Sequence, residues 1–251
     1  MLLTNPRGNY SFLRGISPYS GGVVAAPGYT IELARLSRCV PWREGFDLVD
    51  ATLRAAGRSR SALCAMALRS PAPFTFEGFK EFNAGYVAVL KSWDIFVDGI
   101  NPIARTNVAP ELDPPAEPSL YSFAYTLPAA DAPPAFVVAG AGELPEGSLY
   151  PDDVIRRGDT SPDAIAEKAS FVLSLMEGRM KGLGVWWEQA VVTNLYTVYD
   201  VNALLPSVIL PRIGAAGLHG VTWHYTRPPI LSIEYEMDVR GGTRDIVIPR
   251  S

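Results

Sequence analysis

The stretch ATLRAAGRSRSALCAMALRS, residues 51–70, decides which fold the sequence predicts. Its first part ends a helix pattern that begins near residue 41 and stops at Gly57, where glycine favours a helix end. Ala62–Ser70 is an apolar run whose length suits a buried strand. A helix pattern and two strand patterns follow, at residues 76–90, 103–108 and 119–127.

Residues 134–240 repeat this order of elements. The second copy predicts helices at 164–184 and 202–214 and strands at 188–198, 218–225 and 230–239. Ser161 as N-cap, with Pro162 at the first helical position, marks the start of the long helix. Because the helices have one apolar face, each copy predicts an α+β domain with a mixed β-sheet and helices packed on one face. We expect two tandem domains, residues 1–128 and 134–251, joined by a proline-rich linker.

Composition excludes several classes of function. The 251 residues carry 22 Lys+Arg against 26 Asp+Glu, and the basic residues are scattered, so we expect no nucleic-acid partner. No apolar run approaches the ~18 residues that span a membrane, and the first residues lack a signal-peptide pattern, so we expect a cytoplasmic protein. Two cysteines and two histidines at unsuitable spacings predict neither a disulfide framework nor a zinc site.

Several short strings occur in the order found in a known family. They are SPYSGGV (17–23), FKEFNAGYVAVL (79–90), NPIARTNV (101–108), FVVAGAGELP (136–145) and PPILSIEYEMDV (228–239). Together they resemble the RidA/YjgF family of reactive intermediate imine deaminases, which have chorismate mutase-like domains. The resemblance implies a homotrimer of six domains with small-ligand clefts between neighbouring domains. It also implies hydrolysis of an enamine or imine acid to a 2-oxo acid and ammonia, without a metal or an organic cofactor.

The resemblance places a carboxylate-binding site around Arg105. A guanidinium stays charged and binds a carboxylate through two parallel hydrogen bonds, which suits a substrate clamp. Tyr19, Asn107, Ala139 and Gly140 fall on the segments expected to complete the substrate-binding site.

The two copies differ where catalysis is expected. When they are superposed through Gly57 and Gly184, Arg105 falls opposite His219. The closing strand of the second copy contains Glu234, which matches the family's water-positioning glutamate, whereas the corresponding strand of the first copy has no carboxylate. We therefore predict Arg105, Glu234 and His219 as the catalytic residues. His219 and Glu234 are compatible either with a base and its orienting partner or with a structural hydrogen-bonded pair.

Three functions are compatible with these patterns. The first is a hydrolytic deaminase of a small enamine or imine carboxylic acid, with Arg105 holding the carboxylate. The second is a non-catalytic module that binds a small carboxylate. The third is a divergent chorismatase-like pathway enzyme that acts on a cyclic carboxylate. Turnover of an imino acid distinguishes the first function from saturable binding without turnover.

Overall fold

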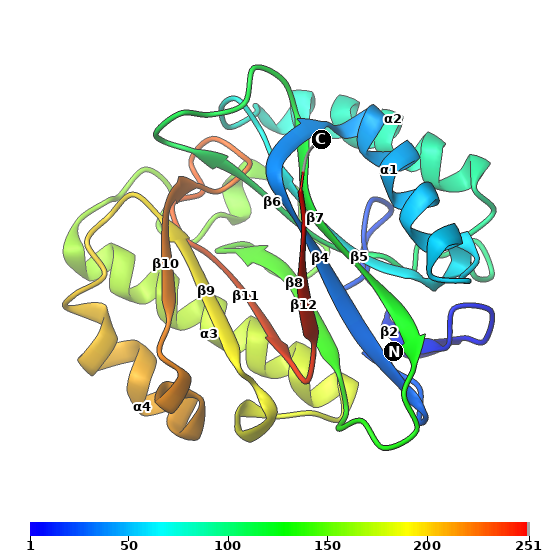
Figure 1. The fold of residues 1–251 in the computed structure, drawn as a ribbon. Helices are drawn as coiled ribbons and strands as arrows, with labels where there is room; N and C mark the ends of the chain where they lie inside the picture. The colour runs from blue at the N-terminus through cyan, green and yellow to red at the C-terminus, as the bar shows by residue number, and fades with distance from the viewer. Residues whose placement is uncertain (250–251) are drawn as a thin grey trace.

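The computed structural model describes residues 1–249, which form one 12-stranded sheet with four α-helices (Figure 1). The first six strands are β1 (Leu2–Asn5), β2 (Tyr10–Leu13), β3 (Gly22–Ala25), β4 (Tyr29–Pro41), β5 (Leu63–Arg69) and β6 (Ala104–Pro110). The other six are β7 (Ser119–Pro128), β8 (Phe136–Gly142), β9 (Val192–Thr197), β10 (Thr222–Arg227), β11 (Glu236–Gly241) and β12 (Arg244–Ile248). The helices are α1 (Trp42–Ala55), α2 (Phe76–Ser92), α3 (Pro162–Leu183) and α4 (Leu210–Ile213).

The prediction of two tandem domains, each with its own sheet, is wrong. The strand order is β1-β2-β3-β8-β11-β9-β10-β6-β5-β7-β4-β12, without a break between the halves. The expected halves exchange strands: β3 pairs with β8, and β12 pairs in parallel with β4. An antiparallel pairing of β10 with β6, at Thr226 with Pro110 and Arg227 with Ala109, joins the two halves directly. These pairings connect segments far apart in the chain, so the local hydrophobic period does not specify them.

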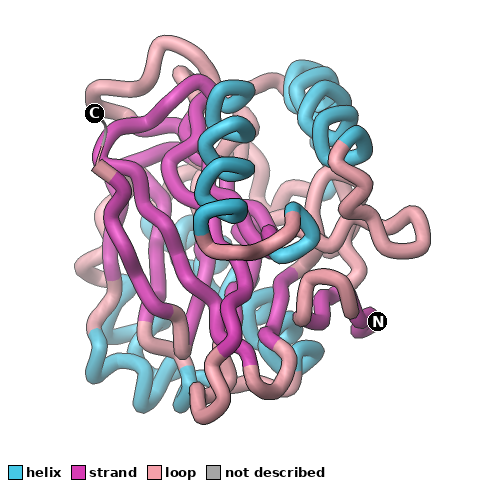
Figure 2. The backbone as a smooth tube through the Cα atoms, turned by 45° about the vertical axis from the view of Figure 1, so that its right-hand side comes forward, coloured by secondary structure: helices cyan, strands magenta, loops and turns pink. Residues whose placement is uncertain are grey.

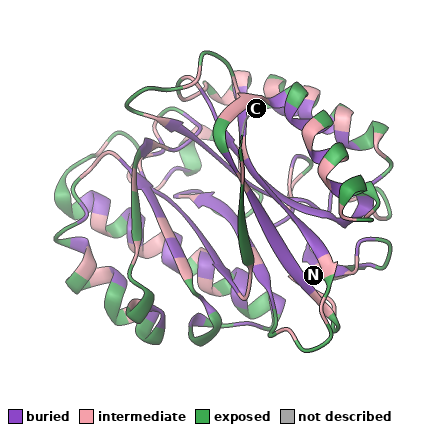
Figure 3. Cartoon of the chain, viewed as in Figure 1, coloured by how far each residue is buried: buried purple, intermediate pink, exposed green. Residues whose placement is uncertain are grey.

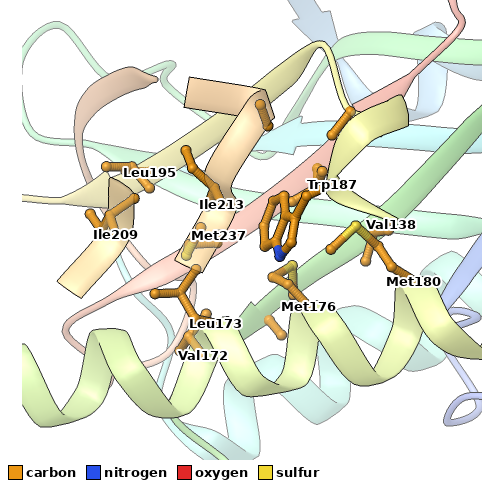
Figure 4. Close-up of a cluster of buried hydrophobic side chains, with 14 of the residues drawn as sticks. Val138, Val172, Leu173, Met176, Met180, Trp187, Leu195, Ile209, Ile213 and Met237 are labelled. Atoms are coloured by element: carbon orange, nitrogen blue, oxygen red, sulfur yellow. The ribbon is translucent and has the colours of Figure 1, made fainter. Parts of the chain in front are cut away.

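Two groups of helices cover different parts of the sheet (Figure 2). The helices α1 and α2 pack on the half that contains β5 and β7, and α3 and α4 pack on the half that contains β8, β9 and β11. Figure 4 shows the core between α3, α4 and the sheet, where Met176 and Met180 of α3 pack against Val138, Leu195 and Met237 of the strands. Burying each such side chain contributes about 1.5–3 kcal/mol, so these cores hold the helices against the sheet.

The inner strands are largely buried, whereas β12 is mostly exposed (Figure 3). Across the interior, Thr106 of β6 donates a hydrogen bond of 2.7 Å to Asp238 of β11. The two halves therefore face each other around a shared interior, from which the candidate site is built. Within residues 1–249, no helix combines the length and apolar character needed to cross a membrane.

Candidate active site

Arg105 is a buried cation on β6, with 3% of its surface exposed. Aromatic rings surround its guanidinium carbon, at centroid distances of 4.9 Å for Tyr19, 4.8 Å for Tyr86 and 5.5 Å for Phe79. Neither of its terminal nitrogens, Nη1 and Nη2, has a hydrogen-bond partner within residues 1–249. Burial lowers the pKa of Arg105, but a guanidinium remains charged in proteins. An unpaired buried charge is costly, so this arrangement suits an anionic ligand that supplies the missing acceptors.

Asn107 adds a third unpaired donor to the same pocket. It lies two residues after Arg105 on β6, and such neighbours share one face of a strand. Its Oδ1 accepts a hydrogen bond of 3.0 Å from Ser70 Oγ, which orients the amide, while its buried Nδ2 has no partner in the described chain. The pocket that Arg105 and Asn107 line has a volume of about 70 Å³. Three N–H-bearing nitrogens thus meet a cavity suited to one small carboxylate.

Glu236 supplies the carboxyl group of the pocket. It is the first residue of β11 and is 4% exposed. Burial raises the pKa of Glu236 well above its usual value, the charge of Asp238 raises it further, and Arg179 and Arg105 act in the opposite direction. The raised pKa favours a protonated carboxyl, which can donate a proton and afterwards accept one.

Gly140 allows this carboxyl to lie against the backbone of β8. A Cβ at Gly140 would lie 2.2 Å from Oε1 of Glu236 and 3.1 Å from the side chain of Thr106. Any other residue at this position would therefore displace the carboxyl or separate the strands.

Arg179 of α3 fixes the backbone at the pocket wall. Its Nη1 donates to the carbonyls of Ala139 at 2.9 Å and Gly140 at 3.2 Å, and its Nε and Nη2 bind both carboxylate oxygens of Glu146. Burial opposes ionisation of Glu146, but the charge and hydrogen bonds of Arg179 outweigh it and hold the pKa of Glu146 below its usual value. Arg179 is thus already paired, and Arg105 is the arginine of this pocket whose terminal nitrogens are without partners among residues 1–249.

The structure brings four of the predicted site residues to this pocket: Tyr19, Arg105, Asn107 and Gly140. Burial raises the pKa of the Tyr19 hydroxyl, which therefore stays protonated at neutral pH. Ala139 lines a neighbouring cavity, and its carbonyl accepts the hydrogen bond from Arg179.

Two predicted catalytic residues, Glu234 and His219, lie outside the pocket lining. Glu234 precedes β11, and its backbone N–H donates to Oε1 of Glu143 at 2.7 Å. His219 is exposed and ends a short 3-10 helix, Gly214–His219. The strand β10 begins three residues later, at Thr222. The expected superposition of His219 on Arg105 therefore fails, since His219 does not lie on a strand at all.

Sequence reasoning missed Glu236 and Arg179. Glu234 and Glu236 have the same parity, so strand alternation alone cannot choose between them. Arg179 had a usable signal, because it shares a helix face with the apolar Met176 and Leu183, three residues before and four after it. A charge on the buried stripe of a helix indicates a specific polar partner. For metals, no group of three His, Cys, Asp or Glu side chains within residues 1–249 could hold an ion.

The fold resembles that of a chorismatase crystal structure. The match has a TM-score of 0.50 and 12% sequence identity, and it covers 88% of this chain and 77% of the chorismatase chain. At this identity the likeness shows the fold alone.

The sequence comparisons correct the expected family. The resemblance to the RidA/YjgF family is wrong, because its short strings describe local strands and turns and not how they join into one sheet. A 2-amino-5-chloromuconate deaminase of Comamonas testosteroni is 44% identical over 244 residues, which are 96% of this chain and 96% of that protein. The family model described as 2-aminomuconate deaminase CnbZ matches residues 2–246. The chain therefore belongs to the CnbZ family of 2-aminomuconate deaminases.

Proposed function

We propose that this protein hydrolyses a 2-aminomuconate-type substrate, releasing ammonia and leaving a 2-oxo acid. Such a substrate is an unsaturated dicarboxylate whose amino group is attached to the carbon next to one carboxylate. The family and the 44% identical relative support this class of reaction. The observation that carries the assignment to a site is the buried guanidinium of Arg105, whose two terminal nitrogens have no partner among residues 1–249.

Arg105 binds the carboxylate next to the amino-bearing carbon. Its planar guanidinium offers two parallel N–H donors, and Nδ2 of Asn107 offers a third from the same strand face. The surrounding rings of Tyr19, Phe79 and Tyr86 exclude water from the guanidinium, which strengthens its attraction for an anion. Binding in this way fixes the amino-bearing carbon relative to Glu236, and such positioning lowers the barrier to reaction.

Glu236 moves the protons. Its protonated carboxyl donates a proton to the enamine carbon, which converts the enamine to an iminium with an electrophilic carbon. The carboxylate then accepts a proton from a water molecule whose oxygen forms the new C–O bond. Glu236 passes that proton to nitrogen, and the C–N bond breaks as the hydroxyl oxygen forms the C=O bond and returns its proton to Glu236, so that substrate and water give the 2-oxo acid and ammonia. General acid–base help of this kind contributes about 10²–10⁴-fold to the rate.

The direct test uses 2-aminomuconate generated enzymatically in the cuvette. We expect the protein to accelerate the loss of the ultraviolet absorbance of the conjugated substrate and to release one ammonia for each molecule consumed. Saturable binding of the substrate without faster ammonia release would contradict the proposal and would favour a carboxylate-binding module.

A further inference from the structure

A second cavity, of about 310 Å³, lies between the two halves of the sheet. Its lining comes from eight strands, β4 to β11, and includes Thr106 and Asp238, whose hydrogen bond crosses the interior. Thr106 follows Arg105 directly on β6, and adjacent side chains of a strand point to opposite faces. Arg105 lines both cavities, but its guanidinium lies against Tyr19 and Phe79, which line the other pocket and not this one.

Arg69 of β5 brings an uncompensated charge to the central cavity. It is 6% exposed, and no carboxylate within residues 1–249 forms an ion pair with it. Its Nη1 donates to the carbonyl of Leu68 at 2.9 Å, and its guanidinium carbon lies 4.1 Å from the ring centroid of Tyr121. A buried arginine with one carbonyl acceptor has unused N–H donors.

The other charges of the cavity do not neutralise Arg69. Asp238 already accepts hydrogen bonds from Thr106, Asn194 and Tyr196, at 2.7, 2.7 and 2.9 Å. Arg240 and Arg35 both face Asp245, at 2.5 and 3.6 Å. The Nε of Arg35 is also buried without a partner in the described chain. Of the four arginines that line the cavity, Arg105 has its guanidinium among the rings of the other pocket. The other three outnumber by one the carboxylates of Asp238, which lines the cavity, and Asp245, which lies outside the lining, so one positive charge stays unbalanced.

Flat groups form the walls beside Arg69. The rings of Tyr196 and His224 stack at 4.7 Å, and Tyr121 lies under the guanidinium. His224 is bound through Nε2 to Oδ1 of Asn194 at 3.2 Å. Planar side chains of this kind accept a planar ligand by stacking.

We propose that the central cavity binds a small planar monocarboxylate, held by Arg69 and Arg35 and stacked against Tyr121 and the Tyr196–His224 pair. This site adjoins the pocket of Arg105 but uses other charged groups, and it does not rest on the proposed deamination. Its ligand would balance the spare positive charge and supply acceptors for the N–H groups that face the cavity.

The two histidines provide the readout. Burial, together with the charges of Arg69 and Arg35 and against that of Asp238, lowers the pKa of His224 to about 4. A carboxylate bound beside Arg69 offsets that positive charge and raises the pKa of His224. Benzoate is the probe, titrated into the full-length protein at about pH 5, where benzoate is still mostly ionised and a rise in the pKa of His224 increases protonation of its ring, while imidazole C–H resonances are followed by NMR. We expect a saturable shift of the His224 resonance, and the exposed His219 serves as the internal control.

Variants separate this site from the candidate active site. We expect Arg69→Gln to weaken benzoate binding about tenfold or more, since it removes a charged donor, and Arg69→Lys to have a smaller effect. Arg35→Gln provides a second test, and circular dichroism checks that each variant folds. Arg105→Met, which removes the guanidinium of the other pocket, should leave the benzoate-induced shift of His224 in place. A His224 resonance that does not respond to benzoate would overturn the proposal. Binding that survives Arg69→Gln and Arg35→Gln but fails in Arg105→Met would also overturn it.

Discussion

Replacing Arg105 by methionine tests the carboxylate clamp. Methionine keeps an unbranched side chain among the rings of Tyr19, Phe79 and Tyr86 but removes the charge and both unpaired terminal nitrogens. Each hydrogen bond from a charged group contributes about 1.5–3 kcal/mol, so losing two costs about 3–6 kcal/mol of transition-state binding. At about 1.4 kcal/mol per factor of ten, kcat/KM should fall roughly 10²- to 10⁴-fold. Arg105→Lys keeps the charge without the fork, and we expect a loss of about 10- to 100-fold.

The assay is ammonia release from 2-aminomuconate under conditions that give kcat/KM. His219→Ala is the matched control, because His219 is exposed and lies outside the pocket lining, and its kcat/KM should stay within about twofold of the wild type. Thermal unfolding should show that Arg105→Met folds, because the structure pairs neither terminal nitrogen of Arg105 with a protein acceptor in residues 1–249. A folded Arg105→Met protein with a wild-type kcat/KM would refute the clamp.

Three further predictions concern proton transfer, stability and assembly. Because the pKa of Glu236 is raised, its carboxyl keeps its proton to higher pH than an exposed glutamate does, so kcat should fall as pH rises through that raised pKa. A kcat that only increases with pH would contradict this role. Lys168→Met leaves Glu143 buried without its 3.0 Å ion-pair partner, so it should lower the free energy of unfolding in urea by about 3–5 kcal/mol. Adding Glu143→Gln to Lys168→Met should recover part of that loss. Equal stability of the single and the double variant would exclude an uncompensated charge as the cause. The homotrimer expected from the sequence stays a prediction, and light scattering that returns the mass of one 27.2 kDa chain would contradict it.

Local patterns in the sequence were sufficient to locate α1, α2 and α3, whereas the helix expected at 202–214 is a π-helical segment, Leu205–Ile209, followed by the short α4. The long helix begins at Pro162 with Ser161 as N-cap, whose side chain accepts from the backbone N–H of Ala164, and Gly184 ends it at φ 76°. These features depend on residues within one or two turns of one another. The start of α2 at Phe76 was likewise predicted.

The pairing of strands in the sheet could not be predicted from local sequence patterns. The pairing of β3 with β8 connects residues more than one hundred positions apart, and that of β12 with β4 connects residues about two hundred apart. The hydrophobic period of a segment predicts that it is a strand but does not indicate which other strand it pairs with. The same limit affected the site. In the strand expected at 230–239, Glu234 and Glu236 have the same parity, but the strand begins only at Glu236, which lines the pocket and approaches Gly140.

The most direct test of the account compares Glu236→Gln with Glu234→Gln in ammonia release from 2-aminomuconate. The two substitutions are chemically identical and lie two residues apart, but only Glu236 lines the pocket of Arg105. We predict that Glu236→Gln lowers kcat by about 10²-fold or more, because glutamine cannot carry a proton to carbon or take one from water. Glu234→Gln should stay within a few fold of the wild type, since the nearby hydrogen bond to Glu143 comes from the backbone of residue 234. A larger loss in Glu234→Gln, or equal losses in both, would contradict the assignment of proton transfer to Glu236.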